Sequence, residues 1–315
     1  MASLDYRISG HEGFPCRYTW LPKAVRRLTD DPKLFSDEER AMVDLGVGKN
    51  MVRSIRFWSL AAGIAVSSPA KGAGHTLTDF GLALLGDRGF DRFLEDRRTL
   101  WLVHWNIATQ VNNPLLAWDY LLNRWQDPEW VPSAAVRALE KEASAKGASV
   151  SRSTVEQHLD AFLHTYVPTR GRKGTVLEDN LDSPLVELEL IVKVGDREVD
   201  RAAGRREPIY SFRRDEKPEI TAELFEYCLH DFWQRRHANE GTLALREVAH
   251  GHGSPGQIFK LPEDDVRARV MQMTEDANGM FAYNESANLQ QLQRKRETTG
   301  TKLLRGIYSA EGEHA

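Results

Sequence analysis

His11 and Glu12 are the first side chains in the sequence whose types could do chemistry together. They lie within residues 1–20, which are predicted to form an irregular arm rich in polar and aromatic side chains. A histidine beside a glutamate supplies a general base and a metal ligand, as a nuclease requires. The alternative is that the pair attaches the arm to the helical body, or that His11 contacts a phosphate. No HExxH motif and no His/Asp cluster of nuclease spacing accompanies the pair, so both interpretations stay open.

The densest carboxylates of the chain form a second candidate site. They are Glu178, Asp179, Asp182, Glu187 and Glu189. Together with Lys193 they have the composition with which a nuclease gathers magnesium. The last two acids alternate with apolar residues, however, as side chains do on a half-exposed strand. We retain Asp179 and Asp182 as candidate catalytic residues and Mg²⁺ or another divalent cation as a candidate cofactor, with its protein ligands unassigned.

Residues 46–62 are predicted to form a glycine turn followed by an amphipathic helix. At about 100° per residue, one stripe of this helix is apolar. The stripe consists of Met51, Ile55, Trp58 and Ala62. Asn50, Arg53 and Arg56 point away from it, and residues 46–60 contain no acid. A solvated surface helix is the plainer interpretation, but the flanking elements favour DNA contact.

Those flanking elements have the order of a winged helix-turn-helix. Ser36 and Glu39 have capping-box spacing, which predicts a helix that ends near residue 45. Gly46 and Gly48 form the turn, and Gly63 is the expected C-cap of the next helix. Residues 64–68 and 75–77 are predicted to pair as a wing. A helix in this position offers its polar face to a DNA groove.

The candidate DNA contacts follow from this arrangement. Arg53 and Arg56 would reach base edges or phosphates, Asn50 would read adenine, and Lys49 would bind a phosphate. Further contacts come from the arm, the first helix, the wing tip and the basic segment 169–175. The full set is Arg17, Lys23, Lys49, Asn50, Arg53, Arg56, Lys71, Arg170, Arg172 and Lys173. Phe57 and Leu60 are apolar on the same face, which predicts that another element covers part of it.

The segment GVGKN is a poor phosphate-binding loop. It lacks the leading glycine, has Asn50 where a Ser or Thr would hold magnesium, and follows a helix instead of a strand. We therefore expect no nucleotide cofactor.

Periodicity predicts the remaining elements. Residues 20–28 form a short helix, and 96–125 form two helices divided by Pro114, with Trp101, Trp105 and Trp118 in the core. Helices are expected over 133–146, 153–166 (capped by Ser153 or Thr154), 219–237, 242–250 and 263–273. A hairpin pairs 188–194 with 207–212, and a second pairs 280–283 with 289–292. Residues 251–261 are a turn with an extended piece, and a tail that is ordered at most to Tyr308 begins at 298.

The predicted fold class is mainly α, of α+β type. It has an N-terminal winged helix-turn-helix, a helical middle, a β-hairpin and a C-terminal helical, winged-helix-like part. The predicted domains are a winged-helix DNA-binding domain with its arm (1–95), a helical domain (96–166), a basic loop with the β-hairpin (167–217), a C-terminal domain (218–308) and a disordered tail (309–315).

Composition limits the function classes. The chain has 315 residues, is 41% hydrophobic and 28% charged, and carries a net charge of −4. A non-specific DNA coater would be basic, so any DNA contact must come from local patches. No apolar run approaches the ~20 residues that span a bilayer, and no signal peptide is recognisable. With only Cys16 and Cys228, a reducing cytoplasm is expected.

Several segments together resemble one bacterial family. They are SGHEGFPCRYTWLPK, LGVGKNMVRSIRFWSLAAGI, LTDFGLALLG, LEDRRTLWLVHW, GSPGQIFKL and NLQQLQRKRE. The chain is similar to an uncharacterised-domain family found beside sulfurtransferase-like genes in DNA phosphorothioation operons. Its best-understood member is the nicking component of the single-strand phosphorothioation system. Gly13 departs from the pattern, in which a threonine is expected.

The resemblance implies that the protein nicks one strand of duplex DNA so that sulfur can replace oxygen in the backbone. It also implies three protein partners, namely a cysteine desulfurase, a sulfurtransferase and an ATPase of the same operon. The alternative is a non-catalytic DNA-binding adaptor or transcriptional regulator that recruits the sulfur-transfer machinery.

Overall fold

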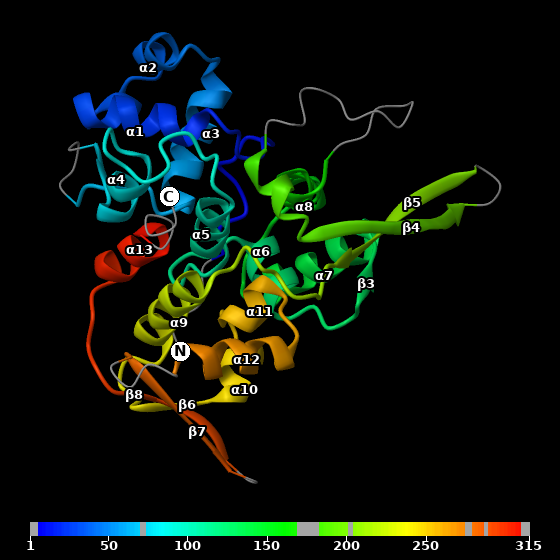
Figure 1. Ribbon diagram of the computed structural model, residues 1–315. Coiled ribbons are helices and arrows are strands. Elements are labelled where there is room, and N and C mark those ends of the chain that lie inside the picture. Colours follow the sequence, from blue (N-terminus) through cyan, green and yellow to red (C-terminus); the bar gives the residue numbers. More distant parts are fainter. Residues whose placement is uncertain are drawn as a thin grey trace. The chain divides into compact units, whose positions relative to one another are not determined.

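A computed structural model gives the fold (Figure 1). It describes residues 6–69, 74–168, 183–200, 204–274, 279–286 and 289–309. These residues form a mixed α/β structure, rich in helices, with small antiparallel sheets. The chain divides into two compact units. The first takes residues up to 121 together with 126–212, and the second takes 122–125 together with 213 onward.

The first unit begins with helices and a short hairpin. In chain order these are α1 (Trp20–Asp30), the 3₁₀ helix η1 (Leu34–Ser36), α2 (Glu38–Leu45), α3 (Lys49–Ala61), β1 (Ala65–Ser67), β2 (His75–Leu77) and α4 (Asp79–Leu85). The Asp37 carboxylate caps α2 by accepting the backbone N–H groups of Glu39 and Arg40, both at 3.1 Å. The predicted cap, Ser36, was wrong because that residue closes the preceding 3₁₀ turn.

The hairpin and α4 pack closely against each other. β1 and β2 are antiparallel, with Ala65 opposite Leu77. Gly81 in the first turn of α4 lies so close to the chain before β1 that an added Cβ would be 2.3 Å from the Ile64 carbonyl oxygen. Helix, turn, helix and hairpin therefore follow in the predicted order, and glycine is required where α4 meets the hairpin.

Four further helices complete the body of this unit. They are α5 (Arg97–Ala108), α6 (Leu116–Asn123), α7 (Pro132–Ala145) and α8 (Arg152–Tyr166). The predicted division at Pro114 is confirmed. The cap of α8 is Ser151, whose hydroxyl accepts the Thr154 N–H at 3.2 Å, and not Ser153 or Thr154 as predicted.

Aromatic side chains from these helices form the core. Trp101, Trp105 and Trp118 are fully buried, as predicted. Trp118 packs edge-on against Phe162 at 5.0 Å between ring centroids, and its indole N–H donates to the Tyr166 hydroxyl at 2.9 Å. The indoles are thus packed inside and are not available to stack on bases.

A small sheet follows the helices in this unit. Its strands are β3 (Glu129–Trp130), β4 (Ile191–Asp200) and β5 (Arg205–Phe212), in the order β3-β5-β4. The β4–β5 hairpin was predicted, although β4 starts at Ile191 and not at Leu188. The reason is the 3₁₀ helix η3 (Pro184–Leu188), which ends at Glu189 in a left-handed conformation with φ of 47°. The two-residue strand β3 was not predicted.

The second unit is organised around one long helix. Its elements are α9 (Ala222–Arg236), β6 (Thr242–Ala244), α10 (Leu245–His250), α11 (Pro255–Phe259), α12 (Glu263–Met273), β7 (Phe281–Ser286), β8 (Leu289–Arg294) and α13 (Gly300–Ser309). The predicted hairpin is confirmed as β7–β8, and β6 adds a third strand to it. Trp233 of α9 stacks on Phe281 at 5.4 Å.

Two predictions in this unit were wrong. Residues 242–244 are a strand and not the start of a helix, because they pair with β8. Residues 255–259 form a helix capped by the Ser254 hydroxyl, not an extended piece. The segment from 298, expected to be ordered at most to Tyr308, contains α13, which ends at Ser309, buries Leu304 and Ile307 and contacts α9. In the part of the chain that the structure describes, no helix has the length and apolar character needed to cross a bilayer.

Candidate nucleic-acid interface

The candidate interface is the surface formed by α2, the turn after it and the N-terminal half of α3. Gly46 closes α2 in a left-handed conformation (φ 65°), and Gly48 is the extended N-cap of α3. The first turn of α3 is therefore exposed to solvent. The exposed or partly exposed polar side chains here are Lys49, Asn50, Arg53 and Arg56.

The opposite side of α3 is in the core. Ile55, Trp58 and Ala62 are completely buried, which confirms most of the predicted apolar stripe. Met51 lies at the edge of the stripe and is only partly buried. The helix is thus held firmly from behind, and its N-terminal half presents cations and an amide outward.

Glu38 of α2 lies among the cations of this surface. Its carboxylate is 2.7 Å from Arg53 Nε and 2.9 Å from Lys49 Nζ. The hydrogen bond from Arg53 and then that from Lys49 lower the pKa of Glu38 to about 2, so the carboxylate is charged at neutral pH. The positive charge of α3 is therefore partly offset by an acid from the preceding helix.

The N-terminal arm covers the second half of α3. The Arg7 guanidinium lies over the Phe57 ring, 4.0 Å from its centroid. The Ser54 hydroxyl donates to the His11 carbonyl at 2.8 Å, and the Trp58 indole N–H donates to the Phe14 carbonyl at 3.0 Å. The prediction that another element covers this face is confirmed for Phe57, whereas Arg56 beside it stays exposed.

His11 is buried against His158 of α8. The Nε2 atom of His11 and the Nδ1 atom of His158 are 3.1 Å apart. The outer nitrogen of each ring faces a backbone donor, because the Gly13 N–H donates to Nδ1 of His11 and the Ala117 N–H donates to Nε2 of His158, both at 3.1 Å. Burial lowers the pKa of His11 to about 4 and that of His158 to about 3, so both rings are neutral at pH 7.

This geometry matches the structural interpretation of His11. The side chain is only 3% exposed and attaches the arm to the helical body. Glu12, by contrast, is exposed, and its charge acts on Arg53. Glu12 adopts φ of 51° and Gly13 adopts 77°, a turn that glycine accommodates more easily than the threonine expected from the resemblance. The two residues of the predicted pair thus have different environments.

The other predicted contacts are dispersed. Lys23 on α1 is exposed, with its Nζ 3.4 Å from the Leu45 carbonyl at the end of α2. Arg17 lies over the rings of Phe14 and Trp20, at 5.7 and 5.4 Å. Several predicted residues fall outside the described residues, namely Lys71, Arg170, Arg172, Lys173, Asp179 and Asp182.

The first unit contains a pocket of about 660 Å³ that the sequence did not predict. Its walls come from residues 18–30 and 85–93, which are distant along the chain. Arg92 and Phe93, in the loop after α4, were not singled out by any motif. Two adjacent residues of these types in a loop carry no signal until the fold places them opposite α1.

Metal binding finds no support in the described ranges. They contain no group of three or more His, Cys, Asp or Glu side chains placed to hold an ion. His250, the last residue of α10, has its Nε2 atom 2.8 Å from a Glu263 carboxylate oxygen.

Comparison with known proteins identifies the family. A model described as "Protein of unknown function (DUF4007)" matches residues 8–308. The chain belongs to this family. The matched range begins in the arm and ends in α13, so the family model covers both units. No curated protein sequence matches the chain.

Solved structures show the same fold. The crystal structure of magnesium ion-bound SspB matches with a TM-score of 0.81 and 23% identity, over 98% of this chain and 91% of SspB. A second SspB crystal structure matches with a TM-score of 0.82 and 22% identity, over 99% and 90%. At this identity the likeness establishes the fold, and SspB is the protein that this family member resembles.

Proposed function

We propose that the chain is a duplex-DNA-binding protein of a bacterial phosphorothioation system and that it nicks one DNA strand. The observation that carries the proposal is the exposed cationic start of α3, held by α2 and a glycine turn, in a chain with the fold of SspB. A helix in this setting suits the major groove. The nicking step and the partners, a cysteine desulfurase, a sulfurtransferase and an ATPase, follow from the resemblance. The cytoplasmic location follows from the presence of only two cysteines.

Each polar side chain of α3 has a role in this proposal. Asn50 and Arg56 are exposed and would read base edges or phosphates. Lys49 and Arg53 would bind phosphates after exchanging the Glu38 carboxylate for them. Because DNA must compete with an internal carboxylate, Glu38 weakens non-specific binding and favours sites where the whole surface is engaged.

No catalytic step is assigned to a described residue. His11 is neutral and buried at pH 7, and the described ranges contain no metal-ligand cluster for magnesium. Asp179 and Asp182 stay the candidate catalytic acids, and Glu12 is an exposed candidate whose charge acts on Arg53. These same observations favour a second candidate function, a non-catalytic DNA-binding adaptor that recruits the sulfur-transfer machinery.

A plasmid assay separates the two functions. Purified protein is incubated with supercoiled plasmid and Mg²⁺, and duplex binding is measured in parallel. A nickase converts the plasmid to open circles, and a combined Asp179→Asn and Asp182→Asn variant keeps duplex affinity while losing this activity. Duplex binding without open circles, over a range of divalent metals, supports the adaptor and contradicts the nickase.

The binding part has its own control. Arg53→Ala should weaken duplex binding and reduce its salt dependence, because a phosphate contact is lost. Arg152→Ala removes an arginine that is likewise paired with carboxylates, here Glu140 and Glu156, but lies on α8. Equal losses in both variants would refute a specific role for α3.

A further inference from the structure

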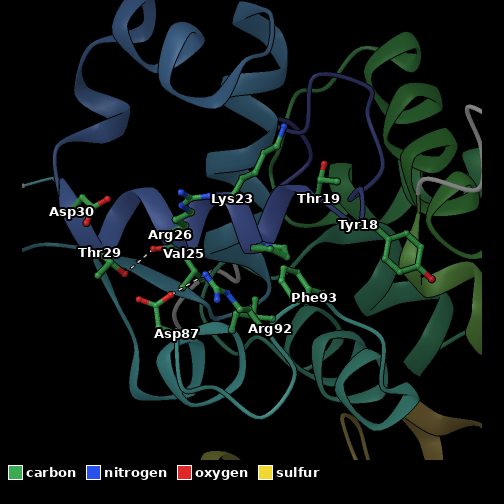
Figure 2. A pocket seen from close by; sticks show the side chains of 12 residues that line it. Tyr18, Thr19, Lys23, Val25, Arg26, Thr29, Asp30, Asp87, Arg92 and Phe93 are labelled. Atoms are coloured by element: carbon green, nitrogen blue, oxygen red, sulfur yellow. Dashed lines mark hydrogen bonds and ion pairs between the residues drawn. The ribbon is translucent and has the colours of Figure 1, made fainter.

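The pocket of about 660 Å³ in the first unit has two different walls (Figure 2). One wall is α1, which contributes Lys23, Arg26 and Thr29. The other comes from α4 and the loop after it, with Asp87, Arg92 and Phe93. In Figure 2, Lys23 and Arg26 extend from one side of the α1 ribbon, and Asp87, Arg92 and Phe93 lie on its other side. The volume is in the range of pockets that hold one small organic ligand.

The α1 wall carries two cations, Lys23 and Arg26, and one acid, Asp30, at the end of the helix. Lys23 and Arg26 are three residues apart, so they lie on one side of the helix, and both are exposed. Within the described ranges neither has an ion-pair partner, and the Lys23 ammonium contacts only the Leu45 carbonyl at 3.4 Å. Two neighbouring cations with unused donors suit one phosphate group.

The opposite wall carries an aromatic ring, and the charge of its arginine is balanced by an aspartate. Arg92 pairs with Asp87 at 3.0 Å, and its guanidinium carbon lies 5.6 Å from the Phe93 ring centroid. The Phe93 side chain is nevertheless 60% exposed. Between the walls, Val25 and Leu85 give the pocket a buried apolar floor. An exposed ring above an apolar floor suits the face of a nucleobase.

We propose that this pocket holds one unpaired nucleotide of a DNA strand. Its base stacks on Phe93, and its phosphate lies between Lys23 and Arg26. The carboxylate of Asp87, on the opposite wall, accepts a hydrogen bond from the base and keeps the phosphate on the α1 side. The hydroxyl of Thr19 lines the same opening.

The position of Lys23 connects the pocket to the duplex surface. Its contact with the Leu45 carbonyl places the α1 wall next to the turn that begins at Gly46. A strand leaving a duplex on α3 would therefore meet Lys23 before it reaches the pocket. The choice of DNA as the polymer rests on the proposed function, whereas the nucleotide site itself rests on the pocket alone.

A short single strand tests the inference without a duplex. The probe is a pentanucleotide with 2-aminopurine at its centre and thymidine elsewhere, titrated with the full chain. Binding should be saturable, with a fluorescence change as the base stacks. Phe93→Ala should weaken it by about 5- to 100-fold, the usual loss for one stacked base. Phe93→Tyr should retain it, and Arg26→Ala should weaken it and reduce its salt dependence.

Matched variants make the result specific. Phe90→Ala removes a second exposed phenylalanine, 41% exposed and outside the pocket lining, and should bind the probe as the wild type does. Arg152→Ala, on α8 and outside both sites, should also leave probe binding unchanged. Failure of the α3 proposal is seen separately, with Arg53→Ala in the duplex assay. The inference is overturned if the wild type does not bind the probe, if Phe93→Ala and Arg26→Ala stay within twofold of wild type, or if Arg152→Ala weakens binding as much as they do.

Discussion

Acidification from pH 7 to pH 5 tests the buried contact between His11 and His158. Both rings are neutral in the folded protein, because burial lowers the pKa of His11 to about 4 and that of His158 to about 3. The neighbouring Arg7 charge also lowers the pKa of His11, and the proximity of His11 also lowers the pKa of His158. In the unfolded chain both rings titrate near 6.5. The unfolded state therefore binds more protons as the pH falls below 6.5, and the free energy of unfolding falls with it.

The size of the effect follows from the same values. At pH 5 each unfolded imidazole is almost fully protonated, while each folded one is still almost neutral. Each histidine then lowers the free energy of unfolding by about 2 kcal/mol relative to pH 7, and the pair by about 4 kcal/mol. This is a large part of the stability of a typical domain.

Urea titrations at the two pH values, followed by tryptophan fluorescence, measure this loss. His158→Gln should remove about half of the pH dependence. His164→Gln is the matched control, because it changes an exposed histidine on the same helix and should leave the dependence intact. If His158→Gln shows the same loss between pH 7 and pH 5 as the wild type and the control, the neutral buried pair is refuted.

Three further predictions concern the candidate interface and its support. Glu38→Gln removes the carboxylate that holds two cations and should raise duplex affinity by about 2- to 5-fold in fluorescence anisotropy; lower affinity would mean that the carboxylate serves to position those cations. Asp37→Ala removes the cap of α2 and should lower the free energy of unfolding by about 1 kcal/mol in urea, and an unchanged midpoint would contradict the capping role. Gly81→Ala places a Cβ against the Ile64 carbonyl and should cost about 2 kcal/mol or more, seen as a lower Tm.

Local signals explain what the sequence could predict. The spacing of Ile55, Trp58 and Ala62 defines a helix and its buried side, and two glycines define the turn before it. Pro114 separates two helices for a similar local reason. The prediction that Ser36 caps α2 was wrong because the carboxylate of Asp37, one residue later, accepts two backbone N–H groups at once. Such signals involve residues that are close in sequence, and the predictions that were confirmed rest on signals of this kind.

The candidate site depends on contacts between distant residues. Residues 46–60 contain no acid, yet Glu38 of α2 pairs with Arg53 of α3 because the two helices pack against each other. His11 and His158 are 147 residues apart, and no pattern predicts that they meet. The pocket combines a wall from residues 18–30 with one from residues 85–93. Charge and pocket shape emerge only when these segments are packed.

The salt dependence of duplex affinity for Arg56→Ala tests the central claim most directly. Arg56 is exposed on α3, and within the described ranges it has no ion-pair partner, so its removal leaves the fold unchanged. The account predicts weaker binding, and a slope of log affinity against log salt that is reduced by about 1 if Arg56 contacts a phosphate. Affinity and slope equal to those of the wild type and of Arg152→Ala would contradict the claim that α3 binds DNA.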